Sequence, residues 1–131
     1  MRFLLDTTTC SAHLRQHPLV YQKMEQHRGQ LAISAITWAE LHTWAIRSNA
    51  ASRRLKLQQL IQDVTFLPVD DVIAETYGTM RARFLNLGKP VPELDSIIAA
   101  TALVNQLIVV TNNTKDFKSI PGLTLQDWTM P

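Results

Sequence analysis

The sequence contains little of what several classes of protein require. One cysteine, Cys10, among 131 residues excludes an internal disulfide, and no Cys/His spacing suggests a structural zinc site. The four glycines form no glycine-rich phosphate loop of either common type, so a nucleotide-binding α/β protein is a remote alternative. No apolar run approaches the length that spans a bilayer, and the N-terminal run is too short for a signal peptide. We therefore expect a cytoplasmic protein without a membrane segment.

The bulk composition indicates one domain with a substantial core. A chain of 131 residues, of which 46% are hydrophobic, has the size of a single domain spanning residues 1–131. Its formal net charge of +2 is small, so any affinity for nucleic acid must come from locally clustered basic residues. No internal repeat, low-complexity tract or linker divides the chain.

Short apolar runs alternate with helical patterns along the chain, which predicts a three-layer α/β/α sandwich around a mostly parallel sheet. Thr7 to Thr9 are expected to cap a helix that starts near Cys10. The segment 89–92 is expected to be a stiff loop through Pro90, with Pro92 as the first helical residue beyond it. The expected strands are 3–5, 31–34, 64–69, 107–110 and 123–125, and the other expected helices are 18–27, a segment capped by Thr37, 52–63, 72–87 and 94–107.

Four acidic residues, Asp6, Glu40, Asp95 and Asp116, lie in or beside apolar runs, where carboxylates are rare. Asp6 ends the first expected strand. In open parallel α/β sheets, ligands bind in the crevice beyond the carboxyl ends of the strands, so Asp6 is well placed for chemistry. These four residues are therefore the candidate catalytic residues.

Carboxylates that share a site repel one another and raise at least one pKa unless a cation neutralises them. Hard oxygen ligands suit Mg²⁺ or Mn²⁺, and Mg²⁺ commonly uses one or two carboxylates while keeping several waters. A metal held in this way polarises a phosphoryl oxygen and lowers the pKa of a bound water. The acids therefore predict a metal-dependent phosphodiesterase.

Each acid also has a simpler interpretation. For Asp6 it is a helix cap beside its threonines, and for Asp95 a place in the first turn of a helix, where the helix dipole favours negative charge. For Glu40 it is a solvated helix residue, and for Asp116 taken alone an exposed loop acid is the better interpretation. The metal-site hypothesis depends on the joint occurrence of all four.

Six short motifs follow one another along nearly the whole chain. They are Leu4-Leu5-Asp6-Thr7, Ile33-Ser34 with Thr37-Trp38-Ala39-Glu40-Leu41, Gly88-Lys89-Pro90-Val91, Asp95-Ser96-Ile97-Ile98-Ala99-Ala100, Val110-Thr111-Asn112-Asn113-Thr114-Lys115-Asp116-Phe117, and Gly122-Leu123 with Asp127-Trp128. No single motif is decisive, but the set is specific. Their order and spacing resemble the PIN-domain ribonucleases, and within them the VapC-type toxins of bacterial and archaeal type II toxin-antitoxin modules.

The resemblance implies that Asp6 and Asp95 are direct metal ligands and that Glu40 either binds metal or orients the water. The fourth acid stays open. Some family members carry it two residues after the strand-ending threonine, where this chain has Asn113, so Asp116 either supplies the missing charge or only supports the site.

The same resemblance makes Thr7, Thr111 and Asn113 candidates for supporting contacts around the metal ligands. Many VapC-type sequences have Asn two residues after the first Asp, where this chain has Thr8. One polar contact at the site is therefore expected to differ in kind.

Two groups of arginines are candidates for contacts with RNA phosphates, Arg47, Arg53 and Arg54 in one segment and Arg81 and Arg83 in another. A solvated helix face is the slightly better interpretation of the first group on charge alone.

Trp38 and Trp44 flank Glu40 on one expected helix. Such rings can stack on bases, although aromatics on helices more often belong to a core or an interface. We expect at least one of the two to contact a partner.

The resemblance implies a Mg²⁺- or Mn²⁺-dependent endoribonuclease that arrests translation, cuts transfer RNA or ribosomal RNA, forms a homodimer and is inhibited by a cognate antitoxin. The alternative is a catalytically weak PIN-like module that binds RNA or protein, because Thr8 and Asn113 depart from the family pattern. The retained Asp6, Glu40 and Asp95 argue against that alternative.

Overall fold

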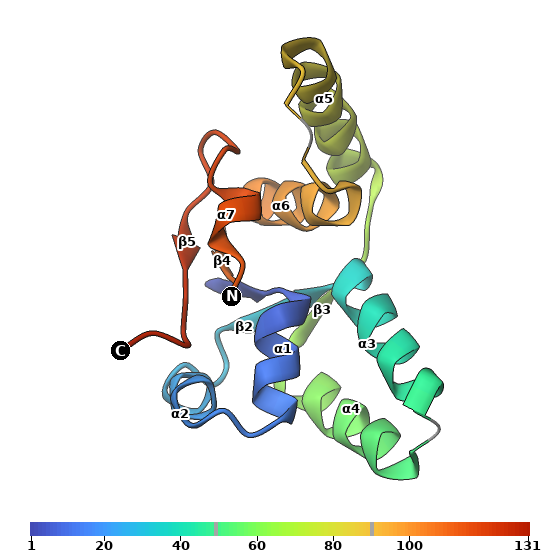
Figure 1. Ribbon diagram of the computed structural model, residues 1–131, viewed down its shortest axis with the longest axis vertical. Helices are drawn as coiled ribbons and strands as arrows, with labels where there is room; N and C mark the ends of the chain where they lie inside the picture. Colours follow the sequence, from blue (N-terminus) through green and yellow to red (C-terminus); the bar gives the residue numbers. More distant parts are fainter. Residues whose placement is uncertain (49, 90) are drawn as a thin grey trace.

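A parallel sheet forms the middle layer of the molecule in the computed structural model, which describes residues 1–48, 50–89 and 91–131 (Figure 1). Among these residues the strand order is β3-β2-β1-β4-β5, and every strand pairing is parallel. Parallel strands buried on both faces consist of nearly continuous apolar residues, which is why runs of three or four residues suffice here. The strands are β1 (Phe3–Leu5), β2 (Leu31–Ser34), β3 (Thr65–Leu67), β4 (Ile108–Val110) and β5 (Leu125–Gln126).

Helices cover both faces of the sheet, so the predicted three-layer α/β/α architecture is confirmed (Figure 1). One layer contains α1 to α4, and the opposite layer contains α6, α7 and α5, which packs on α6. The helices are α1 (Thr7–Leu14), α2 (Pro18–Gln26), α3 (Ala35–Ser48), α4 (Ala51–Asp63), α5 (Asp71–Leu87), α6 (Glu93–Asn105) and α7 (Thr114–Phe117).

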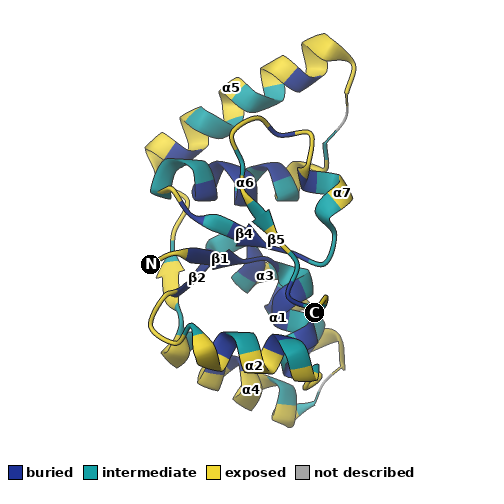
Figure 2. Ribbon diagram, turned by 90° about the vertical axis from the view of Figure 1, so that its left-hand side faces the viewer, coloured by how far each residue is buried: buried dark blue, intermediate teal, exposed yellow. Residues whose placement is uncertain are grey.

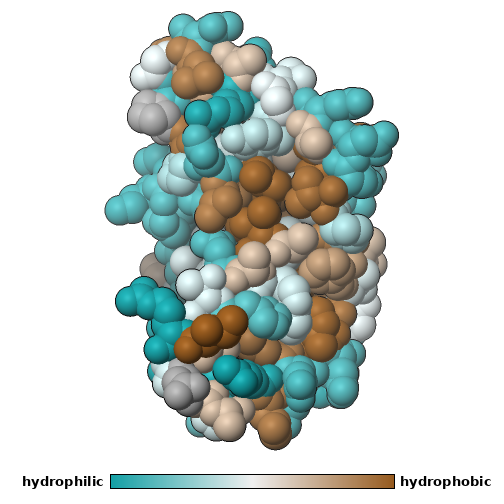
Figure 3. Space-filling model, turned by 90° about the vertical axis from the view of Figure 1, so that its right-hand side faces the viewer, coloured by the Kyte–Doolittle hydropathy of each residue, from teal (hydrophilic) through white to brown (hydrophobic). Residues whose placement is uncertain are grey.

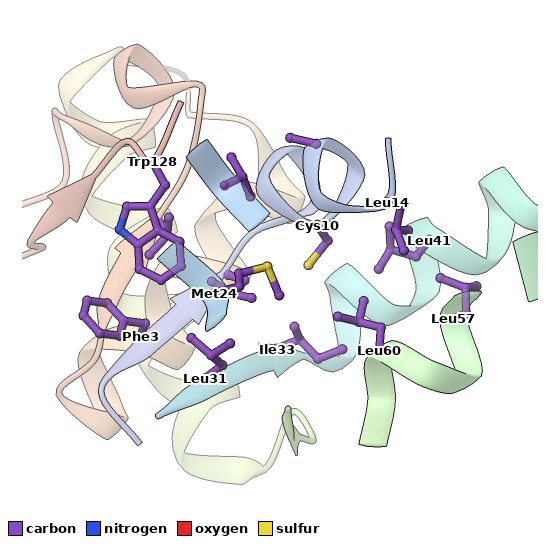
Figure 4. Close-up of a cluster of buried hydrophobic side chains, with 14 of the residues drawn as sticks. Phe3, Cys10, Leu14, Met24, Leu31, Ile33, Leu41, Leu57, Leu60 and Trp128 are labelled. Atoms are coloured by element: carbon purple, nitrogen blue, oxygen red, sulfur yellow. The ribbon is translucent and has the colours of Figure 1, made fainter. Parts of the chain in front are cut away.

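Two apolar clusters fill the spaces between the layers, because successive side chains of a strand point to opposite faces. On β1, Phe3 and Leu5 face the cluster formed with α1 to α4, which Figure 4 shows in close-up. Leu4 faces the second cluster, where it packs with residues of α5, α6 and α7. Cys10 lies fully buried in the first cluster, and burial raises the pKa of its thiol, as expected for a small hydrophobic residue. Helix α6 is buried beneath α5, whose outer side is largely exposed (Figure 2).

Several predicted boundaries were wrong for local reasons. Helix α1 begins at Thr7 rather than near Cys10, because Asp6 is the cap and accepts the amide hydrogen of Thr9 at 2.9 Å. Helix α3 begins at Ala35, ahead of the expected cap Thr37. The Ser34 hydroxyl accepts from the Thr37 amide at 3.2 Å and so takes the capping role.

The remaining differences lie in the second half of the chain. Pro92 is the residue before α6 and not its first helical residue, and Pro90 lies outside the described residues. The third strand is shorter than expected, and the last strand is Leu125–Gln126 rather than 123–125. The short helix α7 was not predicted, since four residues leave no helical periodicity to detect.

The face that carries α3, α4 and α5 has apolar side chains gathered across its middle (Figure 3). Exposed apolar residues on these helices include Ile46, Leu55, Val72, Leu85 and Leu87. Contiguous apolar surface of this kind marks sites where other molecules bind. Within the described ranges, no helix has both the length and the apolar character needed to cross a membrane.

Helix α4 offers a matched test of the first apolar cluster, because Leu57 is 2% exposed and Leu55 is 56% exposed. We expect Leu57→Ala to lower the free energy of unfolding by about 2–5 kcal/mol, since the loss of buried methyl groups leaves a cavity. Leu55→Ala should change it by less than about 0.5 kcal/mol. Urea denaturation followed by circular dichroism measures both values, and equal losses would contradict the described packing.

Candidate active site

The sheet topology places two strand ends together at one edge. Strands β1 and β4 are neighbours, and the chain leaves them toward β2 and β3 on one side and toward β5 on the other. Such a reversal of strand order opens a crevice at the carboxyl ends, which is the usual ligand site of open α/β sheets. Asp6 follows β1 directly and Thr111 follows β4, so both border this crevice.

Asp6 is a nearly buried carboxylate held by neutral donors. Its side chain is part of a residue only 3% exposed, and Oδ1 accepts from the Thr9 amide at 2.9 Å and from the Thr8 hydroxyl at 2.7 Å. Burial raises the pKa of Asp6, and hydrogen bonds from Thr111, Thr9 and Thr8 oppose part of that rise. Asp6 is thus a helix cap that also faces the crevice.

Thr8 links the two strand ends. Besides donating to Asp6, its hydroxyl accepts from the Asn112 amide at 3.0 Å, and the Asn112 side-chain amide donates to the Thr8 carbonyl at 3.3 Å. The hydroxyls of Thr8 and Thr111 lie 3.5 Å apart. Thr8 therefore connects the segment after β1 with the segment after β4, and its presence in place of the family's Asn leaves this junction hydrogen-bonded.

Glu40 lies on α3 and is held in place by a hydrogen bond from α1. The Thr7 hydroxyl donates to Glu40 Oε1 at 2.6 Å, although the two residues are 33 positions apart. This contact fixes the carboxylate of Glu40 relative to the first turn of α1, directly beside Asp6.

Asp116 and Asn113 belong to one hydrogen-bonded unit at α7. The Asn113 side-chain amide donates to Asp116 Oδ2, and the Asn113 backbone amide donates to the Thr111 hydroxyl at 2.9 Å. Asp116 is half-buried, whereas the sequence position of Asp116 alone favoured an exposed loop acid. Asn113 thus contacts Asp116 directly.

Asp95, in the first turn of α6, is affected by the charges of the other three acids. Burial, reinforced by the charges of Asp116, Asp6 and Glu40, raises the pKa of Asp95 from 3.8 to about 6. Within the described part of the chain, none of the four acids forms an ion pair with a basic side chain. The site therefore has an excess of negative charge.

The donor set fits a hydrated divalent cation. In the described residues, no three Asp, Glu, His or Cys side chains stand in a ready-made coordination shell. Mg²⁺ does not require one, because it commonly binds through one or two carboxylates and retains waters. Carboxylate oxygens are the hard ligands that Mg²⁺ and Mn²⁺ prefer, and the uncompensated charge favours a cation.

The candidate RNA-binding arginines occupy different surroundings. Arg47 and Arg53 line a cavity together with Glu40, whereas Arg54 lines another cavity together with Trp38. Arg81 pairs with Glu93 at 2.7 Å and borders a cavity that reaches Asp116, and Arg83 is exposed. The structure thus brings Arg47, Arg53 and Arg81 near the acids and leaves Arg54 in a separate cavity.

Sequence reasoning missed two contacts, the one between Thr8 and Asn112 and the one between Asn113 and Asp116. The only available signal was that each residue lies within six positions after the end of β1 or β4. The carboxyl ends of neighbouring parallel strands meet at one edge, so polar residues there are candidates for mutual hydrogen bonds.

A parallel α/β/α sandwich with carboxylates gathered at its switch point defines a hydrolase of the metal-dependent nuclease type. The comparisons with known proteins name the family: a model described as "PIN domain" matches residues 3–123. The chain belongs to the PIN-domain family, and the predicted nuclease class is confirmed.

Two relatives carry the name "tRNA(fMet)-specific endonuclease VapC". The Shigella flexneri protein is 32% identical and the Salmonella typhimurium protein 34% identical, each over 130 residues and 98% of both chains. Among solved structures, VapBC2 from Rickettsia felis bound to a DNA fragment from their promoter has a TM-score of 0.87 and 28% identity. That match covers 98% of this chain and 99% of the other. The fold and the VapC-type resemblance are therefore both confirmed.

The raised pKa of Asp95 predicts how stability depends on pH. Its ionised form is disfavoured in the folded state, so the stability it contributes is present below about pH 4 and is lost as pH rises through about 6. In EDTA, Asp95→Asn should therefore be more stable than the wild type at pH 7 by about 1 kcal/mol, a value reduced because solvent screens this half-exposed group. Urea denaturation at pH 4 and pH 7 measures the difference.

The difference between Asp95→Asn and the wild type should disappear at pH 4. Asp63→Asn, which removes an exposed acid from the end of α4, is the control and should show no such dependence. A stability difference that is the same at both pH values would show that folding does not raise the pKa of Asp95.

Proposed function

We propose that this chain is an endoribonuclease toxin that hydrolyses a phosphodiester bond of RNA with the help of Mg²⁺ or Mn²⁺. The observation that carries the proposal is that the charges of Asp116, Asp6 and Glu40 add to the raised pKa of Asp95 at the end of a parallel sheet. Repulsion among carboxylates is costly unless a cation offsets it, so such a cluster persists where it binds one. The names of the VapC relatives support RNA as the substrate class.

Asp6 and Asp95 would hold the ion, which supplies charge stabilisation at the phosphoryl group and an acidified water. Thr8 and the Thr9 amide fix one oxygen of Asp6 and so set the direction of its carboxylate. Asp95 sits in the first turn of α6, where the charge of Asp6 adds to its raised pKa. Asp116, fixed by Asn113, adds the fourth negative charge that the family pattern places elsewhere.

Glu40 is assigned to orient the attacking water and accept its proton. Thr7 donates to Oε1 only, so the contact fixes the side chain while Oε2 stays available for this task. The short 2.6 Å contact limits the rotation of the carboxylate and keeps it directed toward the site.

Partners follow from the exposed surfaces. We propose that a cognate antitoxin binds over the acids and that its apolar side chains enter the cavity between α5 and α6, which has a volume of about 750 Å³. Phe84, Leu85, Val91 and Pro92 provide its apolar wall and Asp116 borders it, so an occupant would block the site. The exposed Leu87 and Val72 of α5 are assigned to a homodimer interface. VapBC structures from Rickettsia felis and Salmonella typhimurium support a VapB-type partner.

The proposal is tested by cleavage of tRNA(fMet), the RNA named for the two relatives, with Mn²⁺ and after addition of EDTA. Wild-type protein should cleave only with the metal. Asp6→Asn and Asp95→Asn should each lower the rate more than about 100-fold, because even residues that merely hydrogen-bond to metal ligands contribute 10–100-fold. Denaturing gel electrophoresis of the products measures the rates.

Asp63→Asn is the charge-matched control and should cleave like the wild type, since Asp63 ends α4 on the exposed surface. Circular dichroism confirms that each variant is folded. Cleavage that persists in EDTA, or that survives both Asp6→Asn and Asp95→Asn, would contradict the proposal.

A further inference from the structure

A second cavity opens beside Glu40, on the side away from α5 and α6. It has a volume of about 460 Å³ and lies between α3 and the first turn of α4. Residues three, four, seven and eight positions apart lie on the same face of a helix, so its α3 wall is one continuous stripe that starts at Glu40. The residues that line it are Glu40, Thr43, Trp44, Arg47, Ser48 and Arg53.

The two arginines of this cavity, Arg47 and Arg53, have no carboxylate within ion-pair distance in the described residues. The first turn of α4, which contains Arg53, holds no acidic residue. The far end of the stripe is therefore positive, whereas its near end is the acid Glu40.

Trp44 holds one of these arginines in position. The Arg53 guanidinium carbon lies 4.4 Å from the centroid of the Trp44 ring, in a cation–π contact that joins α4 to α3. A guanidinium stacked in this way loses much of its freedom, and its N–H groups, which lie in the guanidinium plane, stay available for an oxyanion. Arg53 is thereby prepared for bidentate binding before any ligand arrives.

The length of the stripe also suits an RNA strand that runs along α3. Seven residues separate Glu40 from Arg47, and a helix rises 1.5 Å per residue, so the acidic and basic ends lie about 10 Å apart along α3. An RNA strand whose scissile phosphodiester lies at the acids therefore continues past Arg47 and Arg53 if it follows α3.

We infer that this cavity is a phosphate subsite for the RNA strand, in which Arg47 and Arg53 bind a backbone phosphate next to the bond that is cut. Trp44 is a positioning residue that fixes Arg53. This inference rests on the proposed ribonuclease function and adds where the substrate strand runs. RNA is favoured over an acidic protein because the cavity shares Glu40 with the site of cleavage.

The test measures binding without cleavage. Fluorescence anisotropy of a fluorescein-labelled single-stranded oligoribonucleotide is followed in EDTA over a series of salt concentrations. Arg47→Gln and Arg53→Gln should each raise the Kd about 5- to 10-fold and reduce the slope of log K against log salt by about 0.7, the value for one phosphate contact on a single strand. Circular dichroism confirms folding.

Arg54→Gln is the matched control, since it removes the same charge one residue away, from a side chain that lines a different cavity. It should leave the Kd within about twofold of the wild type and the salt slope unchanged. Trp44→Leu should weaken binding with all charges present, and Trp44→Phe should restore it, because Phe keeps a ring beneath Arg53.

Equal losses for Arg54→Gln and Arg53→Gln would overturn the inference, since net charge alone would then explain binding. Wild-type binding by both Arg47→Gln and Arg53→Gln would also overturn it. If those variants instead lose affinity for the antitoxin, the cavity binds an acidic protein and the inference is wrong.

Cleavage of tRNA(fMet) with Mn²⁺ separates the phosphate subsite from the proposed ribonuclease function. Cleavage by wild type, Arg47→Gln and Arg53→Gln at equal rates rejects the subsite alone, and arginine-dependent binding without any cleavage rejects the proposed function alone.

Discussion

Repulsion among carboxylates at the carboxyl edge of the sheet is the constraint on which the other features of this protein depend. Asp6, Glu40 and Asp95 come from three different elements, yet the charges of Asp6 and Glu40 help to raise the pKa of Asp95. The fold orients Asp6 and Glu40 with neutral donors: hydroxyls of Thr7 and Thr8, and a backbone amide. Neutral donors fix direction without cancelling charge. The protein alone therefore leaves a negative potential that a divalent cation can relieve, and the same cation supplies the chemistry of phosphodiester hydrolysis.

The sheet topology makes this gathering possible. Because β1 and β4 are adjacent and the chain departs from them in opposite directions, the residues after each strand border one crevice. Asp6 serves two purposes at that place, since its Oδ1 caps α1 while the carboxylate as a whole borders the crevice. The cap ties the start of α1 to the end of β1, and Thr8 ties both to the segment after β4. Structural and chemical roles therefore coincide in the same few residues.

Much of the fold could be predicted from the sequence because the strands are buried on both faces. Phe3–Leu5 and Leu31–Ser34 read as apolar runs without any alternation, as central parallel strands do. The candidate acids could also be named in advance, because a charge at the end of such a run has few structural explanations. Their individual roles stay predictions.

Other features could not be predicted, for physical reasons. The contact between Thr8 and Asn112 joins residues 104 positions apart, and only the pairing of strands brings them together. Helical periodicity places Arg53 and Arg54 on one basic surface, but the packing of α4 against α3 decides that only Arg53 stacks on Trp44.

The central claim is that Asp6 and Asp95 bind a divalent cation, and anomalous diffraction from crystals soaked in Mn²⁺ tests it most directly. We expect an anomalous peak about 2.1 Å from a carboxylate oxygen of Asp6 or Asp95, with Glu40 and Asp116 around it. A crystal that takes up Mn²⁺ elsewhere and shows no peak among these four acids would contradict the claim.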